Sequence, residues 1–166
     1  MNRVEKLLIA AIFVISMSLP LYAQDENSAK KMNEVLSKAA NEGHWQVSAN
    51  EVYMWLKTKQ ADFLVVDVRP AAKAYKAGHI PGAIHIPYNE MLQADNLKKL
   101  PKDKKIILIC ATGQLQNIPL MPLRLLGYDA YTMAFGYAAW QKGSQGGEQM
   151  KAAIDKANTK KYPMEK

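Results

Sequence analysis

The sequence has 166 residues, 49% of them hydrophobic, which suits one globular domain with extensions and excludes a chain that is disordered throughout. Its 22 Lys and Arg residues outnumber its 15 Asp and Glu residues and give a formal net charge of +7. The lysines are scattered, and the sequence has no arginine-rich helix or alternation of aromatic and basic residues. We therefore expect solvated surface charge and no nucleic-acid partner.

The first 23 residues have the three parts of a secretory signal peptide. A short positive head at 2–6 precedes an unbroken apolar run at 7–15, and Pro20 and Ala23 then supply a helix breaker and a small residue for cleavage. The apolar run is shorter than the roughly 20 residues that a membrane span needs. We predict cleavage near Ala23, export to the periplasm or the medium, and no integral membrane segment in the mature chain.

The segment 24–44 is predicted to be a helical extension that precedes the main domain. Apolar residues recur at helical spacing within 25–42, and Gly43 is placed to end the helix. The residues on this stripe are Met32, Val35, Leu36 and Ala39.

The main domain is predicted over 45–142, where short apolar strands alternate with short helices. The predicted strands are 45–47, 63–68, 83–86, 105–109 and 130–132. The predicted helices are 48–59, 70–75, 87–92, 120–126 and 136–140. Strands that are apolar throughout are typical of parallel sheets covered on both faces, so the pattern predicts an α/β fold with a central parallel sheet and helices on both faces.

Two local signals refine this prediction. Ser48 with Glu51 three residues later has the form of a capping box that opens a helix. Pro119 and Pro122 disfavour the start of the helix after the fourth strand, so we expect it to begin late or with an irregular turn. After the domain, 143–166 is predicted to be a glycine-rich linker at 143–147 followed by a weakly amphipathic helical tail.

Cys110 is the only cysteine of the chain, and it directly follows the strand 105–109. The carboxyl end of a central strand is where open α/β sheets place their ligands. If the amides of the loop 111–116 face the sulfur, they form an anion-binding nest that favours an accessible, reactive thiolate. The alternative is a buried cysteine that acts as a small apolar side chain.

Other polar residues near the predicted strand ends have structural interpretations. Asp67 ends an apolar strand and is interpreted as the partner of Arg69 or as a cap of a neighbouring turn. His44, His79 and His85 do not have the spacing of a metal site, so we expect neither a metal nor a cofactor.

Several short motifs follow one another in a fixed order. Asp67-Val68-Arg69 is followed by Gly78-His79-Ile80-Pro81-Gly82-Ala83, by the strand that ends in Cys110, and later by Leu126-Gly127-Tyr128 and Gly136 with Ala139-Trp140. Together they resemble a rhodanese-like domain over about 45–142. The resemblance implies a sulfurtransferase or persulfide carrier. Cys110 would take sulfane sulfur from thiosulfate, polysulfide or a persulfide and pass it to a small thiol or a thiol protein.

The loop after the cysteine differs from the pattern of catalytic members. They commonly carry arginine directly after the cysteine and again four residues beyond, where this chain has Ala111 and Leu115. The substrate is then expected to meet the backbone of the loop, supported by Asp67 and Arg69, and thiosulfate to be a weak donor. The loop residues are Ala111, Thr112, Gly113, Gln114, Leu115 and Gln116.

Two other functions fit parts of this pattern. A cysteine phosphatase needs arginine six residues after its cysteine, and Gln116 stands there, which disfavours that reading. A non-catalytic rhodanese-like binding module, with an incidental thiol, is the alternative to sulfur transfer.

Overall fold

The computed structural model describes residues 26–165, so the predicted signal peptide lies outside the described residues. The chain divides into two compact units, 1–41 and 42–166. In the first unit, residues 26–36 are helical, as the apolar spacing predicts, but the helix ends earlier than Gly43. The short 3₁₀ segment η1 (Ala39–Trp45) is kinked, because Gly43 and His44 have positive φ angles of 63° and 54°. No helix within the described range is long and apolar enough to cross a membrane.

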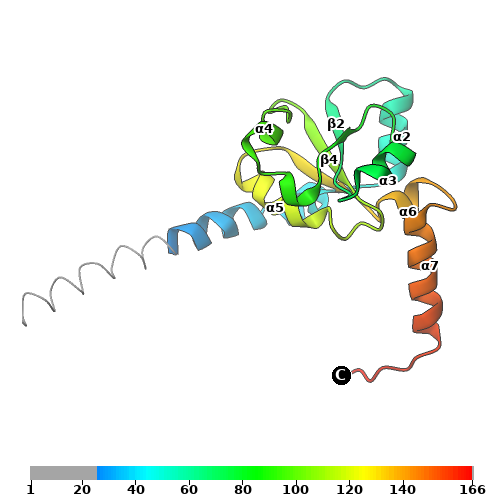
Figure 1. The fold of residues 1–166 in the computed structure, drawn as a ribbon. Helices are drawn as coiled ribbons and strands as arrows, with labels where there is room; N and C mark the ends of the chain where they lie inside the picture. Colours follow the sequence, from blue (N-terminus) through cyan, green and yellow to red (C-terminus); the bar gives the residue numbers. More distant parts are fainter. Residues whose placement is uncertain (1–25, 166) are drawn as a thin grey trace, which may run out of the picture. The chain divides into compact units, whose positions relative to one another are not determined.

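The second unit is built on a five-stranded parallel sheet (Figure 1). The spatial order is β1-β5-β4-β2-β3, and every neighbouring pair is parallel. The strands are β1 (Gln46–Val47), β2 (Phe63–Asp67), β3 (Ile84–His85), β4 (Lys105–Ile109) and β5 (Ala130–Met133). The central pair β2 and β4 is buried on both faces, which explains why these strands are apolar throughout.

Helices cover both faces of this sheet, and the predicted architecture is confirmed. They are α2 (Ala49–Lys57), α3 (Ala72–Ala77), α4 (Ala94–Leu97), α5 (Asn117–Leu125), α6 (Tyr137–Trp140) and α7 (Gln145–Asn158), with the 3₁₀ turn η2 (Tyr88–Glu90). Figure 1 shows α4 and α5 on one side of the central strands and α2 and α6 on the other.

Alternate side chains of β4 belong to two separate cores. Ile106 and Leu108 pack with α5 in one cluster, and Ile107 and Ile109 pack with α2 and α6 in the other. Because side chains of a strand alternate between faces, the residue after Ile109 points toward the α5 side. This register places Cys110 in the first cluster.

The helix after the cysteine loop begins earlier than predicted. α5 starts at Asn117, so the expected late start is wrong. Pro119 is the third residue of the helix, where the amide N–H has no intrahelical partner in any case, so its missing N–H costs nothing there. Only Pro122 lies in the interior and removes one bond.

Residues 145–147 of the predicted linker are the start of α7, so the linker prediction is wrong for them. The Ser144 hydroxyl accepts a hydrogen bond from the amide of Gly147 at 3.1 Å and caps the helix. Gly146 is buried, and a β-carbon there would overlap the carbonyl group of Ala111. Gly146 has no side chain, and this lets α7 approach the backbone of Ala111 closely. The glycine therefore has a packing role and is not a sign of a flexible linker.

Candidate functional site

Cys110 lies at the carboxyl end of β4, where the sequence placed it, but its thiol is not exposed. The residue is 1% exposed, and it is a free cysteine. Leu115 and Leu120 pack against the apolar cluster to which it belongs. The prediction of an accessible thiol is therefore wrong for this conformation, because an aliphatic side chain at the end of the loop packs inward.

The loop 111–116 is held at its ends by side chains. The amide of Cys110 donates to Oε1 of Gln116 at 2.9 Å, and Nε2 of Gln116 donates to the carbonyl of Met133 at 2.6 Å. Nδ2 of Asn117 donates to the carbonyl of Gly113 at 2.8 Å. Gln116 is buried and joins the loop to β5, so its role here is to fix the curvature of the loop.

The amides of the loop make no hydrogen bonds among the described residues. Within residues 26–165, no amide N–H from Ala111 to Gln116 donates to a backbone or side-chain acceptor. Gly113, at the centre of the loop, has a φ of +87°, a left-handed conformation that glycine adopts readily. Unpaired amides in a curled loop are the physical basis of an anion-binding nest.

The helix α6 fixes the start of the loop from the other side. The amide of Tyr137 donates to the carbonyl of Cys110 at 2.9 Å, and the amide of Ala138 donates to the carbonyl of Ala111 at 3.0 Å. Gly136 permits this approach, because a β-carbon there would overlap the Cys110 carbonyl. The backbone around the thiol is thus fixed even though the loop amides are free.

Asp67 and Arg69 form the predicted pair. The Asp67 carboxylate is fully buried and accepts from Nε of Arg69 at 3.0 Å, from Nη2 at 2.6 Å and from the Arg69 amide at 3.0 Å. The hydroxyl of Tyr137 donates to the same carboxylate at 3.2 Å. These contacts of Asp67 hold the chain in place, which agrees with its interpretation as a structural residue.

Tyr137 was not singled out from the sequence, and it links three parts of the site. Its hydroxyl accepts from the amide of Ile80 at 3.0 Å, and its ring lies 4.1 Å from the guanidinium carbon of Arg69. Burial, and then the nearby Asp67 carboxylate, raise the pKa of Tyr137 to about 12. Its position in the sequence could have indicated a place in the site. Tyr137 follows the end of β5, and the carboxyl ends of parallel strands lie at one edge of the sheet.

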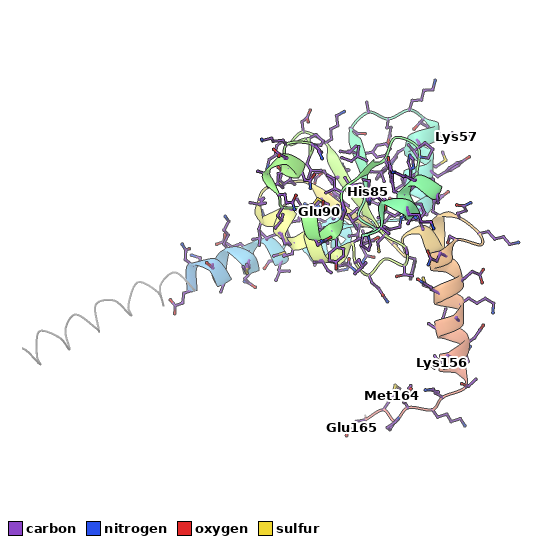
Figure 2. The ribbon with its side chains drawn as sticks, in the orientation of Figure 1. Lys57, His85, Glu90, Lys156, Met164 and Glu165 are labelled. Carbon is purple, nitrogen blue, oxygen red and sulfur yellow. The ribbon has the colours of Figure 1, made fainter. Side chains whose placement is uncertain are left out.

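The contacts of His79 and His85 are structural, and both rings stack on the ring of Tyr75. Nδ1 of His79 lies 3.0 Å from the Tyr75 carbonyl, and Nε2 of His85 lies 2.7 Å from the Arg69 carbonyl. Figure 2 shows His85 inside the domain, where it helps to hold the backbone of Arg69. No group of three or more His, Cys, Asp and Glu residues in the described part of the chain is placed to hold a metal ion.

The domain has a parallel sheet with a cysteine at the carboxyl end of a central strand. The loop that follows has backbone amides that donate to no acceptor among the described residues. Together these features define a class of cysteine-loop domains. Residues 48–143 match the rhodanese-like domain family. This is more than half of the sequence, and the chain belongs to that family.

Curated relatives share the domain within longer chains. The tRNA sulfurtransferase of Desulfurococcus amylolyticus is 35% identical over 82 residues, which are 49% of this chain and 16% of that protein. The adenylyltransferase and sulfurtransferase uba4 of Ogataea parapolymorpha is 35% identical over 74 residues, 45% of this chain and 18% of that one. The chain therefore spans less than a fifth of either relative.

A solved structure supports the fold. The BH2092 protein of Bacillus halodurans has a TM-score of 0.56 at 29% sequence identity, and the match covers 65% of this chain and 79% of that one.

Proposed function

We propose that this protein transfers sulfane sulfur and that Cys110 carries the sulfur as a persulfide. The observation that carries the proposal is a single cysteine at the start of a loop whose amides have no acceptor among the described residues. Relatives of this domain bear the name sulfurtransferase, which supports the same chemistry.

The chemistry is two successive displacements at sulfur. The Cys110 thiolate attacks the outer sulfur of a persulfide R–S–SH, so that a new S–S bond forms, the old one breaks and R–S⁻ leaves. With thiosulfate the leaving group is sulfite. A thiophilic acceptor, such as a thiolate, then attacks the outer sulfur of the Cys110 persulfide and restores the thiolate. The loop amides stabilise the negative charge on the bound sulfur by hydrogen bonds that are already oriented.

The buried thiol requires a side chain of the loop to move before a donor can reach it. Leu115 packs against the cluster that holds Cys110, and the loop amides make no hydrogen bonds that such movement would break. We propose that displacement of the Leu115 side chain opens the path to sulfur, since it exchanges apolar contacts only.

We also propose a location and an acceptor for this sulfur transfer. The protein acts after export and cleavage near Ala23, on small sulfur compounds in the periplasm or the medium. The acceptor is a small thiol or a thiol protein, and no nucleic acid takes part.

The test uses mass spectrometry of the purified, reduced protein after exposure to thiosulfate or to polysulfide. We expect the mass to rise by one sulfur atom, at Cys110, and cyanide to remove that sulfur as thiocyanate. Cys110→Ser is the control and should gain no sulfur.

A protein that gains sulfur from neither donor, under conditions that also label the thiol with a small alkylating reagent, would contradict the proposal. The burial of Cys110 is the observation that favours the second candidate, a non-catalytic binding module. That reading would follow from such a result.

A further inference from the structure

An apolar groove of about 470 Å³ lies between α6 and α7. Its apolar lining residues are Phe135, Ala138, Ala139, Gly147, Met150 and Ile154. Among the described residues that line the groove, only Lys151 is charged. Phe135 is 61% exposed and Ile154 is 56% exposed, so two large apolar side chains lie open to water on one hollowed face. Exposed apolar surface gathered in this way marks an interaction site.

The domain covers only the first turns of α7. Gly146 is buried and Met150 is half-buried, whereas every residue from Lys151 to Asn158 is exposed. An isolated helix of about 14 residues is marginal in water, and Gly146 and Gly147 lower the helix propensity of the first turn further. The helix is therefore expected to gain stability from a partner that covers its open side.

The open side of α7 carries an apolar stripe that suits another helix. Met150, Ala153, Ile154 and Ala157 recur at intervals of three and four residues and share one face, which we call the α7 stripe. Its alanines let a second helix axis approach closely. Helices that lie on a lipid surface typically present several bulky Trp, Phe and Leu side chains, and this stripe has only two bulky side chains. A helix is therefore the better occupant.

The charges beside the α7 stripe are complementary to themselves. Lys151 and Asp155 lie one turn apart on the same flank and form an ion pair, and both side chains are exposed, so each can also contact a second molecule. A two-fold axis at the level of Ala153 makes the two helices antiparallel and sets Lys151 of one copy level with Asp155 of the other. The basic ends of the two helices, with Lys160 and Lys161, then lie apart.

We propose that α7 is a dimerisation helix, which docks antiparallel in the groove of a second copy of this chain and pairs Lys151 with the partner's Asp155. The two stripes cover each other, and the one charged residue of the groove meets a carboxylate. Because both copies use the same surface, the assembly closes at two. The inference is independent of the proposed sulfur transfer, since it uses no residue of the cysteine loop.

Analytical ultracentrifugation of the purified mature protein tests the dimer. Interfaces below about 1,200 Å² belong to weak associations, so sedimentation is followed from about 1 µM to about 1 mM, and we expect a reversible monomer–dimer equilibrium. Ile154→Glu sets two negative charges against each other inside the paired stripes and should weaken the dimer by about a hundredfold. Ala152→Glu is the matched control. Ala152 lies two residues from Met150 and from Ile154, on the opposite side of the helix, so this variant should associate as the natural chain does.

Charge reversal tests the antiparallel arrangement. Lys151→Glu alone and Asp155→Lys alone each place like charges against each other in the pair, and each should weaken the dimer about tenfold. An equimolar mixture of the two variants should associate as tightly as the natural chain, because each copy then meets the opposite charge on the other. The ion pair within α7 is absent from both variants, so a more stable helix cannot explain such a recovery.

Three outcomes overturn the inference: a monomer at every concentration, a dimer that Ile154→Glu leaves intact, or a mixture of the two charge variants that recovers no association. A monomer that sediments with phosphatidylglycerol vesicles, and loses this binding in Ile154→Glu, would assign the α7 stripe to a lipid surface instead. Hydrogen exchange of the buried strand β4 should be the same in all the variants, since the substituted side chains are exposed.

Discussion

Leu115 stands where a charge would help a dianionic donor, and it packs over the cluster that holds Cys110. A charge-assisted hydrogen bond to departing sulfite is worth roughly 1.5–3 kcal/mol, or about 10- to 150-fold in rate. We predict that Leu115→Arg raises kcat/KM for thiosulfate at least tenfold and changes transfer from an uncharged polysulfide chain much less. Steady-state rates with both donors measure this.

The matched control for that substitution is Leu92→Arg, because Leu92 is an exposed leucine outside the loop. It should leave both rates unchanged. Vigorous thiosulfate turnover by the natural sequence, or no gain in Leu115→Arg, would show that the backbone amides alone suffice for sulfite to leave.

The buried carboxylate of Asp67 accepts from Arg69 and Tyr137, and its loss leaves these donors unpaired. We predict that Asp67→Ala lowers the free energy of unfolding by about 3 kcal/mol, which is the lower end of the range for breaking a buried ion pair. Urea denaturation measures the loss. Sulfur loading of Cys110 in the fraction that remains folded should persist, whereas unchanged stability with abolished loading would mean that Asp67 takes part in the chemistry.

At the scale of one helix, the capping box of α2 has two separable contributions. The Ser48 hydroxyl accepts from the Glu51 amide at 3.2 Å, and the Glu51 carboxylate accepts from the Ser48 amide at 2.7 Å. We predict that Ser48→Ala lowers the free energy of unfolding by about 1 kcal/mol. Chemical denaturation at neutral pH checks this value.

The same cap gives the fold a dependence on acid. Hydrogen bonds from Ser48 hold the pKa of Glu51 below its ordinary value of 4.5. A carboxyl group with a lowered pKa in the folded state stabilises the fold above its unfolded pKa, and this stabilisation is lost as the pH falls through the folded pKa. Glu51→Gln should therefore destabilise the protein at neutral pH and lose less stability than the natural chain when the pH is lowered below 4.5.

The first turn of α7 offers a matched pair of glycines. A β-carbon on Gly146 would overlap the carbonyl of Ala111, whereas one on Gly147 would come closest to the Ser144 hydroxyl, at 3.2 Å. We predict that Gly146→Ala costs about 1–3 kcal/mol through overpacking and increases amide hydrogen exchange in α7. Gly147→Ala should be close to neutral, since the higher helix propensity of alanine offsets the slight crowding. Equal effects of the two substitutions would mean that α7 does not press on the loop.

These elements also show what the sequence can and cannot predict. The parallel sheet and the position of Cys110 were predictable, because apolar runs and turn residues are local signals. The burial of the thiol and the start of α7 were not. Each depends on residues that are far apart in the chain and are brought together by the folded sheet, as when Gly146 is required by the carbonyl of Ala111.

For the whole molecule, the single buried cysteine bears on the proposed export. Oxidising compartments drive thiols into disulfides, and this chain has no second cysteine for Cys110 to pair with. A thiol that is 1% exposed reacts slowly with large oxidised partners, so burial protects it in this conformation. A persulfide carrier outside the cytoplasm needs this protection between turnovers.

We predict that the native protein isolated from its host begins at Gln24, lies outside the cytoplasm and keeps Cys110 as a thiol or persulfide. Intact-mass analysis of the fractionated cells measures all three, with iodoacetamide added after denaturation to count the free thiol. Ile12→Arg places a charge in the apolar run and should leave an uncleaved precursor in the cytoplasm, because the segment is then too polar to act as a signal. A natural chain that retains Met1 in the soluble cytoplasmic fraction would contradict export, and a disulfide-linked dimer in the exported fraction would show that burial does not protect the thiol.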